Sequence, residues 1–433
     1  MHSPGPRRTI GLTLAGVTVS LLAAGCVGAG GGGGSTASSG SSSSKITPAV
    51  PKSGQITLTE YDYYTTPGGI TAMQDVIKAF EAKYPNVTIK RQEVPYPSVD
   101  KLVTLEEAGN TPNIVIEDQD YLDQYYPGLV PLTTFFSNSF INQFLPGGTQ
   151  SVMLNGNKYG LQIFGGNDTA LIYNKTDFAA AGIKAPPKTW DELLADAKKL
   201  TVPAKNRYGF EIAGSQAENS TWQLEPFVWS SGGDLSKPTT AAWNQSMSLW
   251  NEMVKKGYMP SAVTGWDQTA EENHFEDNNV AMEINGPWNV PLLQSSKLNW
   301  GVAPIPVQQS GQTLQVPVGG EGWTIGKSTK TKEAASAAFL QFAAQDRSLN
   351  LKAVNSVGYL PSIKSEISGY SARYPAYSVF ADEFQHGRAR VYGNNYGQVS
   401  AAIQLMIGNV LSGKASVSQG LSTLSTTVSH IKK

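Results

Sequence analysis

The chain has 433 residues, a formal net charge of −1 and only 15% charged residues. This length is enough for two or three domains with sizeable cores, and the near-neutral charge argues against binding to nucleic acid or to an anionic membrane surface. A single Cys excludes an internal disulfide and a Cys-based zinc site, and the four scattered His lack metal-ligand spacing. We therefore expect neither a metal ion nor another cofactor.

The first 25 residues have the composition of a signal peptide. Arg7 and Arg8 form a charged region, and an apolar run from Ile10 to Ala24 follows. That run is too short for a membrane-spanning helix of about 20 residues. It ends at Cys26 in a pattern that resembles the lipobox of bacterial lipoproteins, in which this Cys becomes the lipidated first residue. The match departs from the usual pattern at Ala23, where Leu is commonest, and the alternative is a secretory signal peptide with an incidental Cys.

Residues 26–53 are rich in Gly, Ser, Ala and Thr and cannot bury a core. This composition predicts a flexible tether with a root-mean-square reach of about 30 Å. No later apolar run approaches the roughly 20 residues of a membrane-spanning helix. We expect the folded part of the chain to begin at residue 54.

Strands and helices alternate after the tether. We expect strands at Gln55–Tyr61, Val87–Val94 and Asn113–Glu117, separated by helices at Met73–Tyr84 and Lys101–Ala108. This alternation is typical of an α/β domain with a largely parallel sheet, in which ligands bind beyond the carboxyl ends of the strands.

Two pairs of polar side chains follow strands of this sheet. Tyr63 and Tyr64 come after the first strand, and Asp118 and Gln119 come after the third. Their positions make all four candidate ligand contacts. The alternative for the tyrosines is that they cap an interface between two domains.

The stretch from Asn157 to Leu200 predicts a passage from one domain to another. Two short strands, Tyr159–Phe164 and Ala170–Tyr173, flank two glycines that are followed by Asn167 and Asp168. Small turn residues let the backbone change direction there at little cost. Asn167 and Asp168 could hydrogen-bond a ligand, or they could hold the turn.

The helix that follows this passage has a strong start signal. Thr189 and Glu192 have the spacing of a capping box, in which each side chain accepts a hydrogen bond from the other residue's backbone. Further along we expect a strand at Arg207–Ala213, then a polar turn at residues 230–234 between Trp229 and Asp234. A helix with Trp243, Met247, Trp250 and Val254 at helical spacing comes next, and such a stripe is more often core than ligand site.

The last part of the chain continues the α/β pattern. A strand at Asn279–Asn285 leads into a loop with Trp288, and an extended segment, Asn299–Pro306, follows. A second Gly-rich passage, Gly319–Trp323, resembles the first one in kind. We expect a helix from Ala335 onward and two closing helices, and we find no internal repeat of solenoid length.

Several segments, in this order and spacing, resemble the family 1 extracellular solute-binding proteins of ABC importers, which are mainly carbohydrate binders. The segments are AFEAKYPNV, NKYGLQ, ALIYNKTDFAAAGI, PPKTWDELLADAKKLT, VAMEINGPW, WGVAPIP and VGGEGWTIGKSTKTKEAASAAFLQF. The resemblance implies a two-lobed fold of the periplasmic-binding-protein kind, each lobe a mostly parallel sheet flanked by helices, joined by a hinge. It places one lobe at 54–166 and 319–357 and the other at 167–318 and 358–433.

The same resemblance implies a function. The protein would capture a sugar or oligosaccharide between two closing lobes and deliver it to the permease subunits of an ABC transporter. It would work as a monomer on the outer face of the cell membrane, attached only through its lipidated N-terminus. Flat aromatic rings suit the C–H faces of a sugar, and amides and carboxylates suit its hydroxyls.

This expectation adds candidates in the loops and passages beside Asn167 and Asp168. Trp288 is the candidate platform for a sugar ring, and the other candidates are Trp229, Asp234, Glu321, Trp323 and Arg388. For Arg388, and for Arg390 near it, the alternative is an ion pair without a ligand role.

Two other functions remain open. A surface-anchored glycoside hydrolase could use a carboxylate pair such as Asp118 and Glu321, although no G-x-S-x-G, P-loop or zinc motif is present. A binding protein for a non-sugar solute, such as a polyamine or peptide, is the other. We expect a binding protein and not an enzyme.

Overall fold

The computed structural model describes residues 45–96, 98–390 and 395–431. The predicted signal peptide, the predicted lipidation site Cys26 and the predicted tether as far as residue 44 lie outside these described residues. Within the described ranges, no helix combines the length and the apolarity that crossing a membrane requires.

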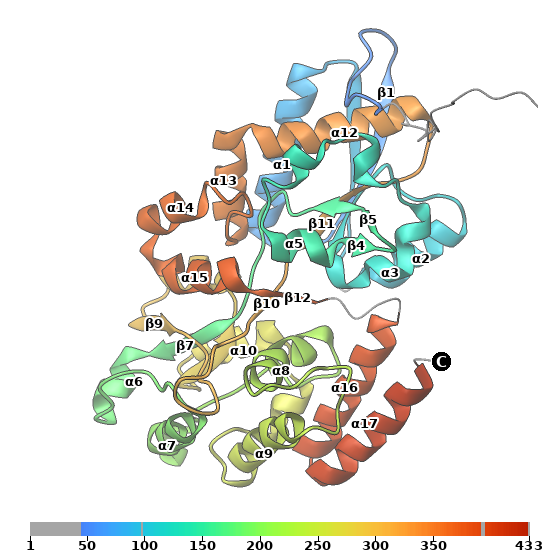
Figure 1. Cartoon of the computed structure of the whole chain (residues 1–433). Coiled ribbons are helices and arrows are strands. Elements are labelled where there is room, and N and C mark those ends of the chain that lie inside the picture. The colour runs from blue at the N-terminus through green and yellow to red at the C-terminus, as the bar shows by residue number, and fades with distance from the viewer. Residues whose placement is uncertain (1–44, 97, 391–394, 432–433) are drawn as a thin grey trace, which may run out of the picture. The chain divides into compact units, whose positions relative to one another are not determined.

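The first lobe is built on a five-stranded sheet with the order β2-β1-β3-β11-β6 (Figure 1). The strands are β1 (Ile56–Asp62), β2 (Val87–Glu93), β3 (Ile114–Asp118), β6 (Gly160–Leu161) and β11 (Glu321–Ile325). β1 pairs in parallel with β2 and β3, as the sequence predicts, whereas β11 runs antiparallel to β3 and to β6.

Helices cover both faces of this sheet because successive side chains of its strands point to opposite sides. Leu58 of β1 and Ile116 of β3 pack in one core with α1 (Pro67–Lys83), α12 (Lys330–Gln345) and α13 (Arg347–Val357). Val115, the neighbour of Ile116 in β3, points to the opposite face and packs in a second core with α2 (Val99–Glu107) and α3 (Leu122–Tyr125). Alternation along the strand therefore fixes which helices lie on which face.

Short elements complete this lobe. They are η1 (Gln119–Tyr121), η2 (Tyr126–Gly128), η3 (Leu132–Thr134), α4 (Asn138–Ile141), α5 (Pro146–Ser151), β4 (Met153–Leu154) and β5 (Asn157–Lys158). The end of the predicted tether also belongs here, because the Ile46 amide donates to the carbonyl of Thr134 (2.9 Å) and Ile46 and Val50 pack against the core. The prediction of a free tether up to residue 53 is therefore wrong from Lys45 onward, where apolar residues interrupt the Gly- and Ser-rich composition.

The second lobe is built on a three-stranded sheet with the order β8-β7-β9. Its strands are β7 (Ala170–Asn174), β8 (Met282–Asn285) and β9 (Trp300–Ala303), and β7 is antiparallel to both neighbours. The expected mostly parallel sheet is thus wrong for the named strands of this lobe. The reason is that β7 begins at a passage between the lobes and runs away from it, while β8 ends beside that passage. The same geometry makes β11 antiparallel in the first lobe.

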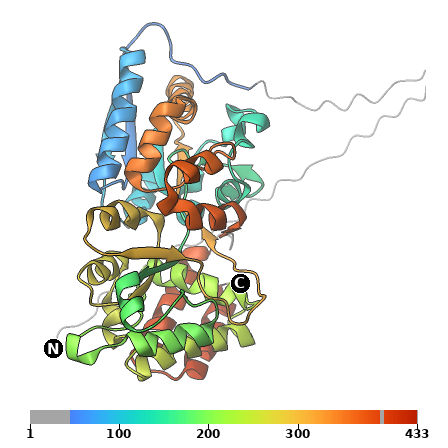
Figure 2. The same cartoon turned by 90° about the vertical axis from the view of Figure 1, so that its left-hand side faces the viewer.

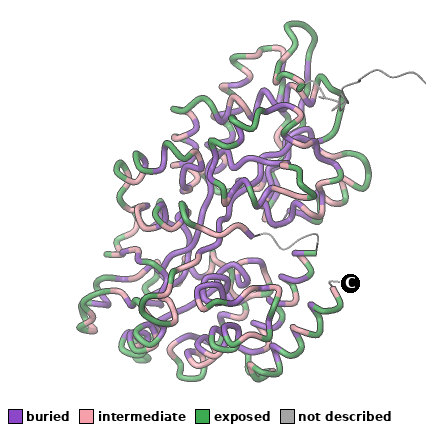
Figure 3. Tube along the Cα trace, in the orientation of Figure 1, coloured by how far each residue is buried: buried purple, intermediate pink, exposed green. Residues whose placement is uncertain are grey.

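Both faces of the second sheet are buried. Leu171 packs with α7 (Trp190–Leu200), α8 (Glu218–Ser230), α9 (Ala241–Lys255), α16 (Tyr396–Leu411) and α17 (Val417–Ile431). Ala170 and Ile172 pack on the other face with α11 (Val290–Ser295), α14 (Ile367–Arg373) and α15 (Ser378–His386). The turned view separates these two groups of helices (Figure 2), and the buried interior of each lobe is continuous along its strands (Figure 3).

The remaining elements of the second lobe and the passages are short. They are α6 (Lys175–Ala180), η4 (Pro203–Lys205), η5 (Ser261–Gly265), α10 (Gln268–Glu276), η6 (Pro287–Asn289), β10 (Pro317–Val318), η7 (Pro375–Tyr377) and β12 (Arg388–Ala389). The capping box at Thr189 and Glu192 is confirmed, and the Trp and Met stripe of α9 is core as predicted. The strand expected at Arg207–Ala213 is not formed. This segment makes only isolated bridges, from Arg207 to Val202, from Tyr208 to Val280 and from Glu211 to Glu283 of β8.

Three segments of chain run side by side between the lobes. Gly166 exchanges two backbone hydrogen bonds of 2.9 Å with Leu360, and Asn167 exchanges bonds of 3.1 and 2.8 Å with Gly319. The predicted passages at Asn157–Leu200 and Gly319–Trp323 are therefore adjacent in space. Gly165 (φ +90°) requires glycine because a Cβ there would lie 2.0 Å from the carbonyl oxygen of Leu360.

Candidate functional site

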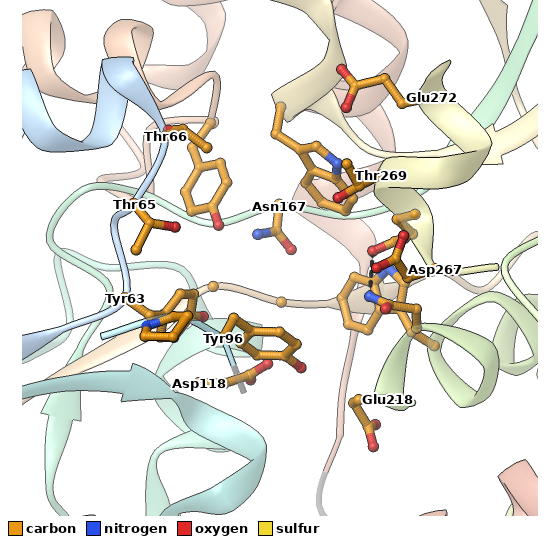
Figure 4. Close-up of a pocket in the computed structure, with 18 of the residues that line it drawn as sticks. Tyr63, Thr65, Thr66, Tyr96, Asp118, Asn167, Glu218, Asp267, Thr269 and Glu272 are labelled. Carbon is orange, nitrogen blue, oxygen red and sulfur yellow. Dashed lines mark hydrogen bonds between the residues drawn. The ribbon is translucent and has the colours of Figure 1, made fainter. Parts of the chain in front are cut away.

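A cavity of about 430 Å³ opens beside these three segments and is lined by residues of both lobes. β1 and β3 run toward it, so the loops after their carboxyl ends supply one wall, and the loops around α8, α10 and β8 supply the other (Figure 4). The backbone of Gly319 and Gly320 lies along it, where a side chain at Gly319 would collide with Trp222 and Asn167. Glycine at position 319 thus leaves the space that these two lining side chains occupy.

Four of the predicted residues line this cavity. Tyr63, Asp118, Asn167 and Trp288 come from four separate segments of the sequence and meet around one space. In Figure 4, Tyr63 and Asp118 lie on one side of the cavity and Asn167 lies at its centre. Their role as ligand contacts remains a prediction, and their convergence is the geometric condition for it.

Tyr64 and Glu321 lie directly behind the cavity wall. The Glu321 carboxylate is buried and accepts hydrogen bonds from the hydroxyls of Tyr63 (2.9 Å), Tyr359 (2.7 Å) and Tyr64 (2.7 Å). Burial raises the pKa of Glu321, while these three hydroxyl donors act in the opposite direction. Tyr63 and Tyr359 line the cavity, so Glu321 positions two of its rings without lining it.

Three other candidates are buried away from the cavity. The Gln119 amide donates to the carbonyl of Val318 (2.6 Å), and Trp323 is fully buried, with its ring 4.6 Å from that of Phe164. Asp168 is also fully buried, one residue past the lining residue Asn167. Alternation along an extended chain explains this, because neighbouring side chains point to opposite sides.

The candidates Trp229, Asp234 and Arg388 form a cluster of their own outside the cavity lining. The Arg388 guanidinium lies 4.5 Å from the centre of the Trp229 ring and pairs with Asp234 at 2.5 Å. This contact is the ion pair that the sequence left open as an alternative.

Several lining residues were not predicted as ligand contacts. Six of them are aromatic or acidic, namely Tyr96, Trp222, Tyr359, Glu218, Asp267 and Glu272, and Gln268 and Thr269 are two others. Arg390, which the sequence offered beside Arg388 with an ion pair as the alternative, also lines the cavity. Asp267 caps α10 by accepting from the Ala270 amide (2.9 Å), and such a cap was a readable signal. Glu218 and Trp222 lie on α8, which the sequence did not reveal as a helix.

Arg390 is the centre of a buried ionic network at one end of the cavity. It pairs with Asp120 of the first lobe and with Glu218 and Glu225 of α8, and the Glu225 contact measures 2.9 Å. Its guanidinium also lies 4.8 Å from the centre of the Trp222 ring. One cation therefore joins groups from both lobes next to the cavity.

Burial shifts the titration of the lining carboxyl groups. It raises the pKa of Asp118 to about 6, against the lowering effect of Arg390. It raises the pKa of Glu218 to about 8 and that of Glu272 to about 7. The cavity lining therefore combines these carboxyl oxygens, which can accept hydrogen bonds, with aromatic rings that can stack on the apolar face of a ligand.

Asp118 and Glu321 are not placed as the carboxylate pair of a glycoside hydrolase. Asp118 faces the cavity, but Glu321 is covered by three tyrosine hydroxyls and does not line it. Retaining and inverting hydrolases both need two carboxyl groups that flank the bond to be cleaved.

Comparisons with known proteins agree with this geometry. A family model described as bacterial extracellular solute-binding protein matches residues 75–378. A binding protein of Brucella abortus is 30% identical over 270 residues, which are 60% of this chain and 65% of that protein, so the chain spans about 65% of the length of this relative. A maltooligosaccharide ABC transporter solute-binding lipoprotein of Streptococcus pneumoniae is 24% identical over 67% of this chain and 69% of that protein.

Among solved structures, maltose-bound T. maritima MalE3 has a TM-score of 0.76 to this chain. The match covers 87% of this chain and 99% of that one at 21% sequence identity, and it shows the shared two-lobed fold. These relatives are binding proteins. Because the family model covers well over half of the sequence, the chain belongs to the family of bacterial extracellular solute-binding proteins.

Proposed function

We propose that this protein binds an oligosaccharide in the cavity between its lobes and delivers it to an ABC transporter permease. The observation that carries the proposal is that five aromatic side chains from both lobes converge on one space of about 430 Å³. They are Tyr63, Tyr96, Trp222, Trp288 and Tyr359. Such rings stack on the C–H faces of pyranoses, and the carboxylates between them accept from hydroxyls.

The ligand class proposed is a short α-glucan. The printed names of a relative and of a structural neighbour mention maltooligosaccharide and maltose, and the cavity volume falls within the ordinary range for small-ligand sites. Micromolar affinity would correspond to about −8 kcal/mol. A ligand that touches both lobes favours the closed arrangement only through contacts that the open one lacks.

The proposal includes the lobe boundaries and the membrane anchor. The lobes would comprise residues 54–166 with 319–357 and residues 167–318 with 358–433, and they would move about the three adjacent segments at Gly166, Gly319 and Leu360. A monomer would be held at the outer face of the cell membrane by lipid on Cys26, in keeping with the lipoprotein named among the relatives. Replacing Cys26 with Ser should move the protein from the membrane fraction to the soluble one, and unchanged fractionation would contradict the anchor.

The test of binding is thermal stabilisation by a sugar panel. Maltose, maltotriose and maltotetraose, at concentrations about 100 times Kd, should stabilise the protein by about 2.7 kcal/mol. Parallel assays for released reducing sugar should show no turnover, because the proposal assigns no catalytic residue. Turnover, or stabilisation by peptides or polyamines and not by sugars, would overturn it.

A further inference from the structure

The cavity contains many more negative than positive groups. Four of its lining residues carry carboxylates, namely Asp118, Glu218, Asp267 and Glu272. Among the described residues that line it, Arg390 is the only one with a basic side chain. A neutral sugar would therefore leave three acidic groups without a cation, and burial raises the pKa of two of them, Asp118 and Glu272, to about 6 and about 7.

The single cation is already engaged before any ligand arrives. Arg390 pairs with Asp120, Glu218 and Glu225, and the side chains of all four residues are at most 4% exposed. Buried charges are stable only when they are paired, so this guanidinium serves the protein's own carboxylates. In the described part of the chain, Asp118, Asp267 and Glu272 have no ion pair.

Some of the hydrogen-bond donors around the cavity are engaged as well. The hydroxyls of Tyr63 and Tyr359 both donate to Glu321, so their oxygens offer only lone pairs to a ligand. The Asn219 amide donates to the side-chain oxygen of Gln268 at 2.7 Å. The cavity is consequently rich in acceptors, and a ligand rich in donors fits it best.

Two buried donors that line the cavity are free within the described ranges, the indole N–H of Trp222 and the side-chain amide of Gln268, and they distinguish two classes of donor-rich ligand. The indole N–H of Trp222 has no hydrogen-bond partner among the described residues, although Trp222 is only 6% exposed and lines the cavity. An unsatisfied buried donor calls for an acceptor on the ligand. A sugar hydroxyl or ring oxygen supplies one, whereas a simple polyamine does not.

We propose that the preferred ligand is an oligosaccharide that carries a protonated amino group, held between Asp267 and Glu272 on one wall and Asp118 on the other. An ammonium group has three donors and no acceptor, and it balances charge that a hydroxyl cannot. It is also attracted to the faces of the aromatic rings that line the same space. Figure 4 shows Asp267 and Glu272 across the cavity from Asp118.

This inference rests on the proposed function and names the chemistry of its ligand. The test is calorimetry on the full-length protein near neutral pH with matched sugars. They are maltotriose, maltotriose with one hydroxyl replaced by an amino group at a 2- or a 6-position, and the N-acetylated form of each amine. We expect at least one amine to bind at least tenfold more tightly than maltotriose and than its own N-acetylated form.

Two cavity variants and one surface control locate the effect. Asp267→Asn and Glu272→Gln should each reduce the ratio of amine to maltotriose affinity at least threefold. Glu107→Gln removes the same charge from an exposed position at the end of α2 and should leave the ratio unchanged.

The outcomes separate this inference from the proposed function. If maltotriose binds and neither amine binds more tightly, the amino-sugar inference is overturned and sugar binding stands. If an amine is preferred but both cavity variants keep the full ratio, the assignment to Asp267 and Glu272 is overturned. If no sugar of the set binds, both proposals fail.

Discussion

The Glu321 carboxylate holds the hydroxyls of three tyrosines, and this arrangement gives a sharp prediction for Glu321→Gln. The carboxylate offers one oxygen to Tyr63 and Tyr359 and the other to Tyr64. Glutamine keeps a single acceptor oxygen and places an NH₂ donor where the other oxygen was. At least one tyrosine hydroxyl then loses its acceptor, and the remaining hydrogen bonds are no longer made to a charged group.

The magnitude follows from the hydrogen bonds that change. A hydrogen bond to a charged group contributes about 1.5–3 kcal/mol, compared with about 1 kcal/mol for a neutral pair. We therefore expect Glu321→Gln to lower the free energy of unfolding by about 2 kcal/mol. Because Tyr63 and Tyr359 line the cavity, we also expect sugar affinity to fall about tenfold, which is about 1.4 kcal/mol.

Chemical denaturation and calorimetry near pH 8 would measure the two effects on one preparation. Tyr64→Phe is the matched control, because it removes one hydrogen bond to Glu321 from a ring that does not line the cavity. It should cost similar stability but weaken sugar binding less than threefold. Equal losses of affinity in both variants, or no loss in Glu321→Gln, would refute the idea that Glu321 aligns the cavity rings.

Three further predictions concern the cavity, the passage between the lobes and the buried acids. Trp288→Ala should weaken sugar binding at least tenfold with the fold intact, and unchanged affinity by calorimetry would remove Trp288 from the site. Gly165→Ala should destabilise the protein by more than about 2 kcal/mol because its Cβ would meet the carbonyl oxygen of Leu360 at 2.0 Å, in addition to backbone strain. Gly232 has a similar φ of +86°, but a Cβ there would meet no atom within 4 Å, so Gly232→Ala measures the backbone strain alone. Equal losses of unfolding free energy in the two variants would contradict the clash. Burial, and then a neighbouring carboxylate, raise the pKa of Glu211 to about 10. Because the pKa of this carboxyl group is higher in the folded state, the protein loses unfolding free energy as pH rises from the unfolded-state pKa near 4.5 toward 10. Glu211→Gln should therefore raise the free energy of unfolding by at least about 1 kcal/mol more at about pH 8.5 than at about pH 5.5. An equal effect at both pH values would refute the assignment.

The first lobe could be predicted well from local patterns. Ile56 and Leu58 alternate with exposed threonines, which marks a strand with one face in the core. Because strand ends meet at one edge of a parallel sheet, Tyr63 and Asp118 could be assigned to a common site before their positions were known. The capping box at Thr189 similarly fixed a helix start from two residues.

The second wall of the cavity could not be predicted in the same way. Nearly all of α8, including Glu218 and Trp222, is buried. The helix therefore has no solvent-exposed face and lacks the periodicity by which a surface helix is recognised. Tyr359 and Arg390 reach the cavity through long-range packing that no local pattern encodes. Trp323 was placed in the site because it follows a Gly-rich passage, but β11 turns its side chain into the core.

The central claim is that the ligand is held between the two lobes, and calorimetry with one truncated ring on each side tests it most directly. Tyr63 belongs to the loop after β1 in the first lobe, and Trp222 belongs to α8 in the second. If a sugar bridges the lobes, Tyr63→Ala and Trp222→Ala should each weaken binding of the best sugar of the panel at least tenfold. If only one of the two changes affects affinity, the sugar is bound by a single lobe and the account is contradicted.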